Sequence, residues 1–213
     1  MKGKIIEFCK ANKVMLISFT FVWFCLLVFD CMYPKIQTHL ILNGYHTPFL
    51  DTFFKYTTVL GEAFPVYVGV AFFIFNRRNG LFILLGQGLT CLITQVLKFA
   101  FAHPRPATYF KQMGVDLPQT VENVKLRTAC NSFPSGHTSA AFALFTCLAL
   151  ITPRKWSPLW LTAAWLVAYS RIYLSQHFLE DILLGSLIGM VSSCAVYMIM
   201  DYYINKKKEV GQL

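Results

Sequence analysis

Long apolar segments alternate with short polar ones along most of this chain. Apolar residues dominate six stretches, at residues 14–29, 63–75, 81–102, 137–151, 159–173 and 178–204. A helix needs roughly 20 residues to cross a bilayer, and in lipid it satisfies its own backbone hydrogen bonds. The second stretch is short unless part of residues 53–60 joins it. Because the stretches are too long for barrel strands, the pattern predicts an all-α integral-membrane bundle of six transmembrane helices.

Two mixed segments interrupt this pattern. Residues 31–61 combine aromatic side chains with Gly, Pro and Asp, which is typical of a loop with a short helix lying in the membrane interface. Residues 103–133 are polar and form the one predicted loop that is large enough to act as a lid at the outer face. Since no repeat, low-complexity tract or linker divides the chain, we expect residues 1–213 to form a single domain.

The composition excludes a soluble globule. Hydrophobic residues make up 56% of the chain, charged residues only 14%, and the mean hydropathy is +0.52, whereas soluble domains average about 25% charged residues. The net charge of +9 would suggest a nucleic-acid partner in a soluble protein. Here eleven cations and three acids lie on the side of the termini, against eight and seven on the other side.

This asymmetry predicts an orientation. Positive charge gathers on the cytoplasmic side of membrane proteins, so we expect both termini to be cytoplasmic. The partners are then membrane lipids and not nucleic acid, and the sequence does not address the oligomeric state. The seven cysteines contain no C-x-x-C pair, which argues against a metal site. Cys31 and Cys130 are both expected on the outer side, where a disulfide is one alternative.

The predicted topology places several reactive side chains at one membrane depth, at or beside four helix ends. These residues are Lys98, Arg105, Ser135, Gly136, His137, Arg171, His177 and Asp181. Ionisable groups near a bilayer are costly and usually functional. The alternative for the cations is an anchoring role, in which their charged ends reach the interface.

The spacing of these residues favours chemistry. His177 and Asp181 are four residues apart, so on a helix they lie on one face. The carboxylate can then accept the Nδ1–H of the imidazole and leave Nε2 free to attack. Ser135 and Gly136 precede an apolar helix, whose first backbone N–H groups favour an anion. Arg and Lys side chains supply the charges that a phosphate requires.

Three stretches resemble the tripartite signature of the type 2 phosphatidic acid phosphatases, the lipid phosphate phosphatase family. They are Lys98-x6-Arg105-Pro106, Pro134-Ser135-Gly136-His137 and Ser170-Arg171-x5-His177-x3-Asp181. Every specified position matches in order and spacing, over residues 98–181.

The resemblance implies an enzyme that hydrolyses a lipid phosphate without a metal or another cofactor. His177 would be the nucleophile that forms a phosphohistidine, Asp181 would orient it, and His137 would act as general acid and then base. Lys98, Arg105, Ser135, Gly136 and Arg171 would bind the phosphoryl oxygens. The active site would lie at the outer, periplasmic face of the cytoplasmic (inner) membrane.

The substrate stays open among phosphatidylglycerophosphate, phosphatidate, undecaprenyl pyrophosphate and the phosphates of lipid A. Two other classes remain as alternatives. The same residues resemble the vanadate site of haloperoxidases, which are soluble oxidoreductases, and a non-catalytic lipid-binding or transport protein could retain the site. His39, His46 and His103 fall outside the motifs and are expected at the interface or in loops. Glu180 is expected to point away from Asp181 and to have a solvated or structural role.

Overall fold

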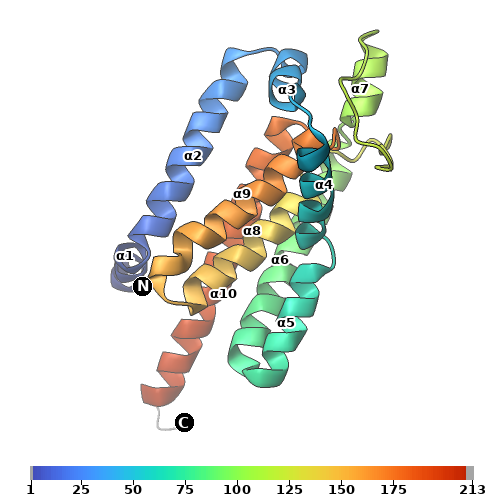
Figure 1. Ribbon diagram of the computed structural model, residues 1–213. Helices are drawn as coiled ribbons and strands as arrows, with labels where there is room; N and C mark the ends of the chain where they lie inside the picture. Colours follow the sequence, from blue (N-terminus) through green and yellow to red (C-terminus); the bar gives the residue numbers. More distant parts are fainter. Residues whose placement is uncertain (1, 210–213) are drawn as a thin grey trace.

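The structure is a bundle of helices. The computed structural model describes residues 2–209, and no strand occurs in that range (Figure 1). In chain order the elements are α1 (Lys2–Ala11), α2 (Lys13–Met32), α3 (Lys35–Asn43), α4 (Pro48–Thr57), the 3-10 helix η1 (Thr58–Gly61), α5 (Phe64–Phe75), α6 (Arg77–Phe101), α7 (Pro106–Gln112), α8 (Gly136–Ile151), the 3-10 helix η2 (Arg154–Trp156), α9 (Ser157–Tyr173) and α10 (Leu179–Glu209). The prediction of an all-α fold is confirmed.

The connection between α5 and α6 is tighter than the sequence suggests. The polar residues 76–80 read as a break between two apolar stretches, yet α6 begins directly after Asn76. The side chain of Asn76 accepts a hydrogen bond from the backbone N–H of Asn79 at 3.1 Å. Because an Asn at this position satisfies a free N–H of the first turn, the polar residues start the helix, and α5 and α6 form an antiparallel pair (Figure 1).

The core is built around α8, which packs against α6, α9 and α10. Most of its residues are buried, including Phe142 and Leu144, which have no exposed surface. The α8–α10 crossing depends on Gly189, because a Cβ there would lie 2.3 Å from the carbonyl oxygen of Ser139. Small residues allow this close approach of two helix backbones. The close packing fixes the start of α10 beside the start of α8.

Within residues 2–209, three helical segments are long and apolar enough to cross a membrane by length and composition. They are Lys13–Met32, Arg77–Gln112 and Leu179–Ile204. A fourth candidate combines Pro48–Gly61 with Phe64–Phe75, which meet at an angle of 52°. The central α8 is apolar but has only 16 residues, or about 24 Å of helix against a hydrocarbon core of about 30 Å.

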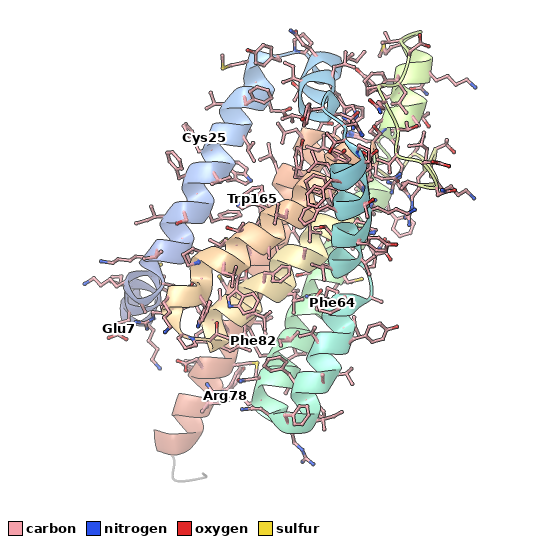
Figure 2. All side chains as sticks on the ribbon, in the orientation of Figure 1. Glu7, Cys25, Phe64, Arg78, Phe82 and Trp165 are labelled. Carbon is pink, nitrogen blue, oxygen red and sulfur yellow. The ribbon has the colours of Figure 1, made fainter. Side chains whose placement is uncertain are left out.

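The outer surface of the bundle is strongly apolar. On α2 the side chains of Ile17, Phe21 and Phe24 are more than half exposed, and Cys25 points away from the bundle whereas Trp165 of α9 points towards α2 (Figure 2). Large apolar side chains on a water-exposed surface would be costly. Together with the long apolar helices, this surface identifies an integral membrane protein.

The predicted interfacial segment contains two short α-helices and a 3-10 helix. Within residues 31–61 the chain forms α3, α4 and η1. Both α3 and α7 lie at the end of the bundle opposite α1 (Figure 1). The last residues of α6 and α9 and the first residues of α8 and α10 meet near this end, and the site described below is built there.

Candidate active site

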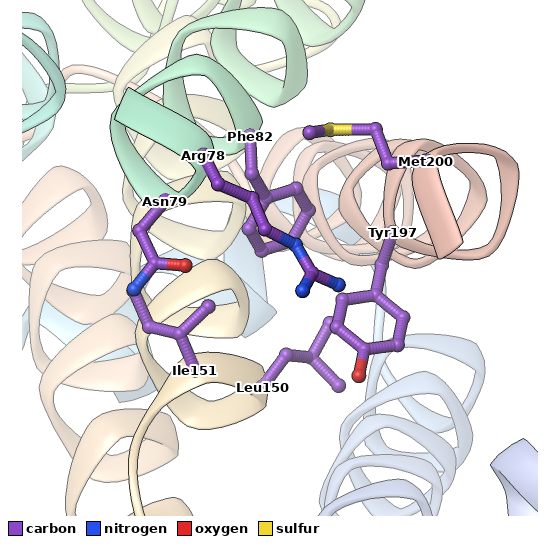
Figure 3. A pocket seen from close by; sticks show the side chains of 7 residues that line it. All are labelled: Arg78, Asn79, Phe82, Leu150, Ile151, Tyr197 and Met200. Atoms are coloured by element: carbon purple, nitrogen blue, oxygen red, sulfur yellow. The ribbon is translucent and has the colours of Figure 1, made fainter. Parts of the chain in front are cut away.

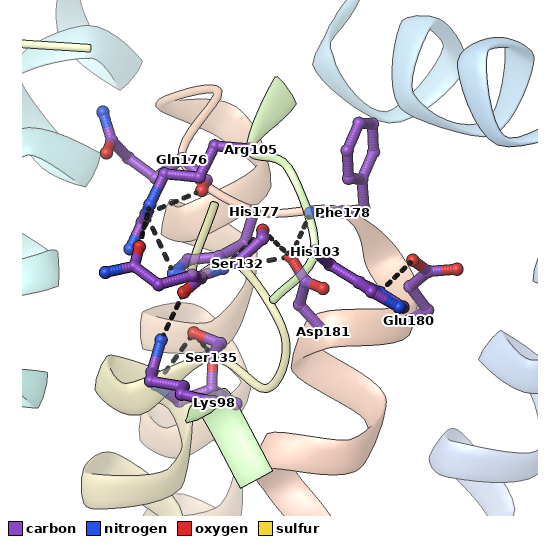
Figure 4. A network of polar contacts seen from close by, with 12 residues as sticks. Lys98, His103, Arg105, Ser132, Ser135, Gln176, His177, Phe178, Glu180 and Asp181 are labelled. Atoms are coloured by element: carbon purple, nitrogen blue, oxygen red, sulfur yellow. Dashed lines mark hydrogen bonds and ion pairs between the residues drawn. The ribbon is translucent and has the colours of Figure 1, made fainter. Parts of the chain in front are cut away.

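The eight residues expected in the site come together between four helix ends. Lys98 lies in the last turn of α6, Arg105 immediately precedes α7, and Arg171 lies in the last turn of α9. The remaining five residues sit at the starts of α8 and α10 or just before them: Ser135, Gly136, His137, His177 and Asp181. Figure 4 shows how these segments enclose one network of polar contacts.

His177 and Asp181 form a buried pair. The Nδ1 atom of His177 lies 3.0 Å from Oδ2 of Asp181, and the two side chains are 2% and 1% exposed. The same carboxylate oxygen accepts a hydrogen bond from the backbone N–H of Phe178 at 3.0 Å and one from the hydroxyl of Ser132. A carboxylate that accepts several hydrogen bonds holds Nδ1 as the protonated nitrogen, so the lone pair of the neutral ring is on Nε2.

The surroundings of His177 keep its imidazole neutral. Burial is the largest cause that lowers the pKa of His177, and the charges of Arg171, Arg105 and Lys98 lower it further, to well below the ordinary value. A guanidinium nitrogen of Arg105 lies 3.4 Å from Nε2. Since a guanidinium only donates hydrogen bonds, this contact agrees with a lone pair on Nε2. The ring is therefore available as a nucleophile at neutral pH.

Each of the three cations is hydrogen-bonded to neutral acceptors. Lys98 Nζ donates to the carbonyl oxygen of Asn131 at 2.6 Å. Arg105 donates to the side-chain oxygen of Asn131 at 2.9 Å and to the carbonyl oxygen of Gln176 at 3.0 Å. Arg171 donates to the hydroxyl of Thr58, a contact supplied by η1.

These contacts do not include a carboxylate. Within residues 2–209, Lys98, Arg105 and Arg171 form no ion pair with a carboxylate, and the buried Nε of Arg171 has no hydrogen-bond partner. Buried cations without a counter-ion are costly. A bound anion removes that cost, and both arginines offer the fork of donors that suits phosphate oxygens.

The first turn of α8 completes the site. Ser135 is the N-cap residue, and its hydroxyl accepts from the backbone N–H of Thr138 at 3.4 Å and from the Thr138 hydroxyl at 3.0 Å. The Ser135 hydroxyl thus caps the N-terminus of α8, whereas the sequence led us to expect it to bind the anion. The backbone N–H of Ser135 donates to the carbonyl oxygen of Asp181 at 3.0 Å, and this bond ties the starts of α8 and α10 together.

Four residues of the network were not identified from the sequence. Asn131 and Ser132 lie three and two residues before Pro134 of the Pro-Ser-Gly-His stretch, so their position beside the site could have been inferred from proximity. Thr58 and Glu62 are distant in sequence and carry no such signal. Glu62 Oε1 lies 3.1 Å from Nε2 of His137.

Two histidines outside the motifs have buried side chains. His39 is 1% exposed, its Nε2 lies 3.3 Å from the hydroxyl of Ser175, and burial lowers the pKa of His39 to about 4. The side chain of His46 is 1% exposed, and its Nδ1 lies 2.9 Å from Asp51 Oδ1. His46 lies in the loop between α3 and α4, as expected, and His39 lies in α3, within the segment expected at the interface. Both rings are buried because α3 and α4 pack against α9.

The structure also shows the contacts of Glu180 and the state of two cysteines. Glu180 has a structural role, because its carboxylate lies 2.5 Å from Nζ of Lys35 and not in the His177 network. Cys31 and Cys130 are both exposed free thiols, so the alternative of a disulfide between them is not realised.

A separate pocket lies far from the reactive groups (Figure 3). Its lining residues are Arg78, Asn79, Phe82, Leu150, Ile151, Tyr197 and Met200. Arg78 and Lys98 lie near opposite ends of α6, about 30 Å apart at the rise of an α-helix. This pocket is therefore not part of the candidate active site.

An apolar helical bundle with a buried His–Asp pair beside three cations defines a membrane protein whose polar site is suited to an anion. The model of the PAP2 superfamily matches residues 79–205, which is more than half of the chain. The chain belongs to the PAP2 superfamily, and the family resemblance seen in the three sequence stretches is confirmed.

Curated relatives and solved structures agree with this assignment. The chain is 31% identical to the lipid A 4'-phosphatase of Porphyromonas gingivalis over 169 residues, which covers 76% of this chain and 71% of that protein. It is 26% identical to the lipid A 4'-phosphatase of Bacteroides thetaiotaomicron, over 77% of this chain and 76% of the relative.

Among solved structures, Aquifex aeolicus LpxE superimposes with a TM-score of 0.67 and 27% identity, over 76% of this chain and 94% of that chain. A PAP2 type phosphatidylglycerolphosphate phosphatase from Bacillus subtilis superimposes with a TM-score of 0.61 and 22% identity, over 87% and 96%. At 22% identity, the second likeness shows only that the two chains share a fold.

Proposed function

We propose that this protein is a lipid phosphatase that hydrolyses a phosphate ester or pyrophosphate of a membrane lipid. The single observation that carries the proposal is the buried pair of His177 and Asp181, in which Nε2 of His177 lies 3.4 Å from a guanidinium nitrogen of Arg105. Lys98 and Arg171 also lie close to this ring. Phosphoryl transfer depends mainly on positioning and on charge stabilisation, and this arrangement offers both. The apolar bundle supplies the surface on which the tail of a lipid substrate rests.

The proposed reaction is the one that the family resemblance implies for these side chains. Nε2 of His177 attacks phosphorus, the bond between phosphorus and the lipid oxygen breaks, and His137 donates a proton to the leaving oxygen. His137 then takes a proton from water, which attacks the phosphohistidine and releases inorganic phosphate. Asp181 holds the His177 ring and stabilises its positive charge.

Five residues bind the phosphoryl oxygens in this proposal: Lys98, Arg105, Ser135, Gly136 and Arg171. The three cations stabilise the charge of the transition state. Gly136 contributes a backbone N–H at the start of α8, where the helix dipole also favours an anion. Because side-chain cations perform this role, we propose that the reaction needs no metal ion.

The relatives narrow the substrate class. Two relatives are lipid A 4'-phosphatases, and a third is a lipid A 1-phosphatase. An undecaprenyl-diphosphatase from Sulfolobus acidocaldarius is 26% identical over 59% of this chain. We therefore propose a cell-envelope lipid as substrate, with a phosphate of lipid A ahead of undecaprenyl pyrophosphate.

The proposed topology has six spans in a single domain, residues 1–213. In it α2, the bent α4–α5 pair, α6, α8, α9 and α10 each cross the inner membrane, which places both termini in the cytoplasm. The site then opens to the periplasm, and the segment between α7 and α8 lies over it as a lid. The excess of cations on the side of the termini supports this orientation.

Phosphate release by the purified full-length protein in detergent tests the function. The substrates are lipid A, undecaprenyl pyrophosphate, phosphatidate and phosphatidylglycerophosphate, each with and without a chelator. We expect activity on lipid A that the chelator does not change, and its complete loss in His177→Ala. The matched control is His46→Ala, which removes another buried imidazole that lies outside the site. Retained activity in His177→Ala would contradict the nucleophile, and strong inhibition by the chelator would contradict metal independence.

A further inference from the structure

The break between α4 and α5, at residues 58–63, takes part in the site although it lies outside the three matching stretches. It also precedes residue 79, where the match to the PAP2 superfamily begins. Three contacts connect the break to the predicted catalytic residues. The hydroxyl of Thr58 accepts from Arg171, a Cβ on Gly61 would lie 2.6 Å from the carbonyl oxygen of His137, and Glu62 contacts the His137 ring.

The Gly61 contact fixes the backbone of the break against the first turn of α8. An added Cβ would also lie 3.0 Å from Val167 of α9, so a larger residue has no space on either side. This close approach brings the next residue, Glu62, over the His137 side chain. The 52° bend between the two helices is therefore the feature that delivers a carboxylate to the site.

The site contains two imidazole–carboxylate pairs in different environments. His177 and Asp181 are almost completely buried, whereas the side chains of His137 and Glu62 are 14% and 50% exposed. The buried pair keeps a neutral ring that suits a nucleophile. The partly exposed pair can exchange a proton with water, as a general acid and base must. Different surroundings thus separate the roles of two similar pairs, one with an aspartate and one with a glutamate.

The charges that face His137 come from several elements. Arg171 of α9 and Arg127 of the segment between α7 and α8 place positive charge near the ring, and His177 also lies close to it. Glu62 supplies the opposing negative charge. A general acid must carry its proton when the substrate is bound, so a neighbouring carboxylate has a direct chemical use here.

We propose that Glu62 is the positioning residue for His137, a role that rests on the proposed phosphatase function. Its carboxylate accepts the Nε2–H of His137, which leaves Nδ1 as the reacting nitrogen. The protonated ring gives its Nδ1 proton to the leaving oxygen and keeps Nε2–H on Glu62. The neutral ring then takes a proton from the attacking water at Nδ1.

The test is the pH dependence of kcat in Glu62→Gln. This substitution keeps the shape and removes the charge, and the half-exposed side chain can be replaced without repacking the core. With whichever lipid of the panel the wild-type protein hydrolyses fastest, we expect the alkaline limb of kcat to move about one pH unit lower, which corresponds to about a tenfold loss of kcat above the limb. KM should stay close to the wild-type value.

Two further variants make the result specific. Glu122→Gln changes the charge by the same amount at an exposed position in the segment between α7 and α8, and its pH profile should match the wild type. Glu62→Asp retains the charge, so its alkaline limb should stay near the wild-type position even if kcat falls. Melting temperatures in detergent verify that each variant is folded.

The outcomes separate the two proposals. An active wild-type protein whose alkaline limb is the same in Glu62→Gln overturns the role of Glu62, whatever the change in kcat. An alkaline limb of kcat that moves by the same amount in Glu122→Gln as in Glu62→Gln also overturns the role of Glu62. Absence of phosphate release by the wild-type protein from every lipid in the panel contradicts the phosphatase function itself.

Discussion

The orientation of the Asp181 carboxylate depends on hydrogen bonds from several neighbouring residues. Its four-residue spacing from His177 predicts a side-chain pair, and the structure has that pair at 3.0 Å. The spacing does not predict that Ser132 donates a third hydrogen bond to the same carboxylate oxygen. Ser132 is fully buried and is held by a bond from its backbone N–H to the carbonyl oxygen of His103 at 2.9 Å. It therefore restricts the carboxylate to the orientation that faces Nδ1 of His177.

We expect Ser132→Ala to lower kcat about tenfold, because a lost buried hydrogen bond costs about 1–1.5 kcal/mol. The control is Ser186→Ala, since Ser186 is equally buried but donates within α10 to the carbonyl oxygen of Leu183. Phosphate release by the two purified variants is the measurement. A wild-type kcat in Ser132→Ala would show that the carboxylate keeps its orientation without this bond.

At the scale of elements, the apolar pattern predicted where most helices begin and end. The ends of α8 and α9 at Ile151 and Tyr173 agree with it. It predicted a boundary at residues 61–63, but not the bend between α4 and α5, because the order of apolar and polar residues does not determine the angle between two helices. The bend arises from packing, since the contact of Gly61 with α8 and α9 holds it in place. Glu62, the acid that the bend brings to His137, was missed for the same reason.

The α8–α10 crossing gives a prediction at this scale. We expect Gly189→Leu to destabilise the protein by at least 1–3 kcal/mol, the usual range for overpacking, because its side chain would meet the backbone of Ser139 and Ala143. Gly88→Leu on α6 is the control, since nothing lies within 4 Å of a Cβ there. Melting temperatures in detergent should fall in the first variant and stay level or rise in the second. Equal melting temperatures in the two variants would show that α8 and α10 can move apart without a loss of stability.

At the scale of the whole molecule, the excess of cations on the side of the termini predicts how the bundle sits in the membrane. α1 and the site lie at opposite ends of the bundle (Figure 1), which the proposed orientation requires. The exposed thiols of Cys9 in α1 and of Cys130 beside the site mark these two ends.

Single-cysteine variants that retain Cys9 or Cys130 test this orientation. We expect a membrane-impermeant maleimide to label Cys130 in intact spheroplasts and to label Cys9 only after lysis, because the membrane shields the cytoplasmic end. The lysed sample is the control for the reactivity of each thiol. Labelling of Cys9 alone in intact spheroplasts would place the site in the cytoplasm.

The sequence by itself determined the helical class, the membrane setting and the residues of the candidate site. These depend on local properties: the apolar length of each segment, and the spacing of chemical groups along one helix or at its end. The tertiary structure decided which distant residues surround that site. Ser132, Thr58 and Glu62 reach His177, Arg171 and His137 through packing between segments up to about a hundred residues apart. Such contacts leave no periodic signal in the chain, because they arise only when the helices pack.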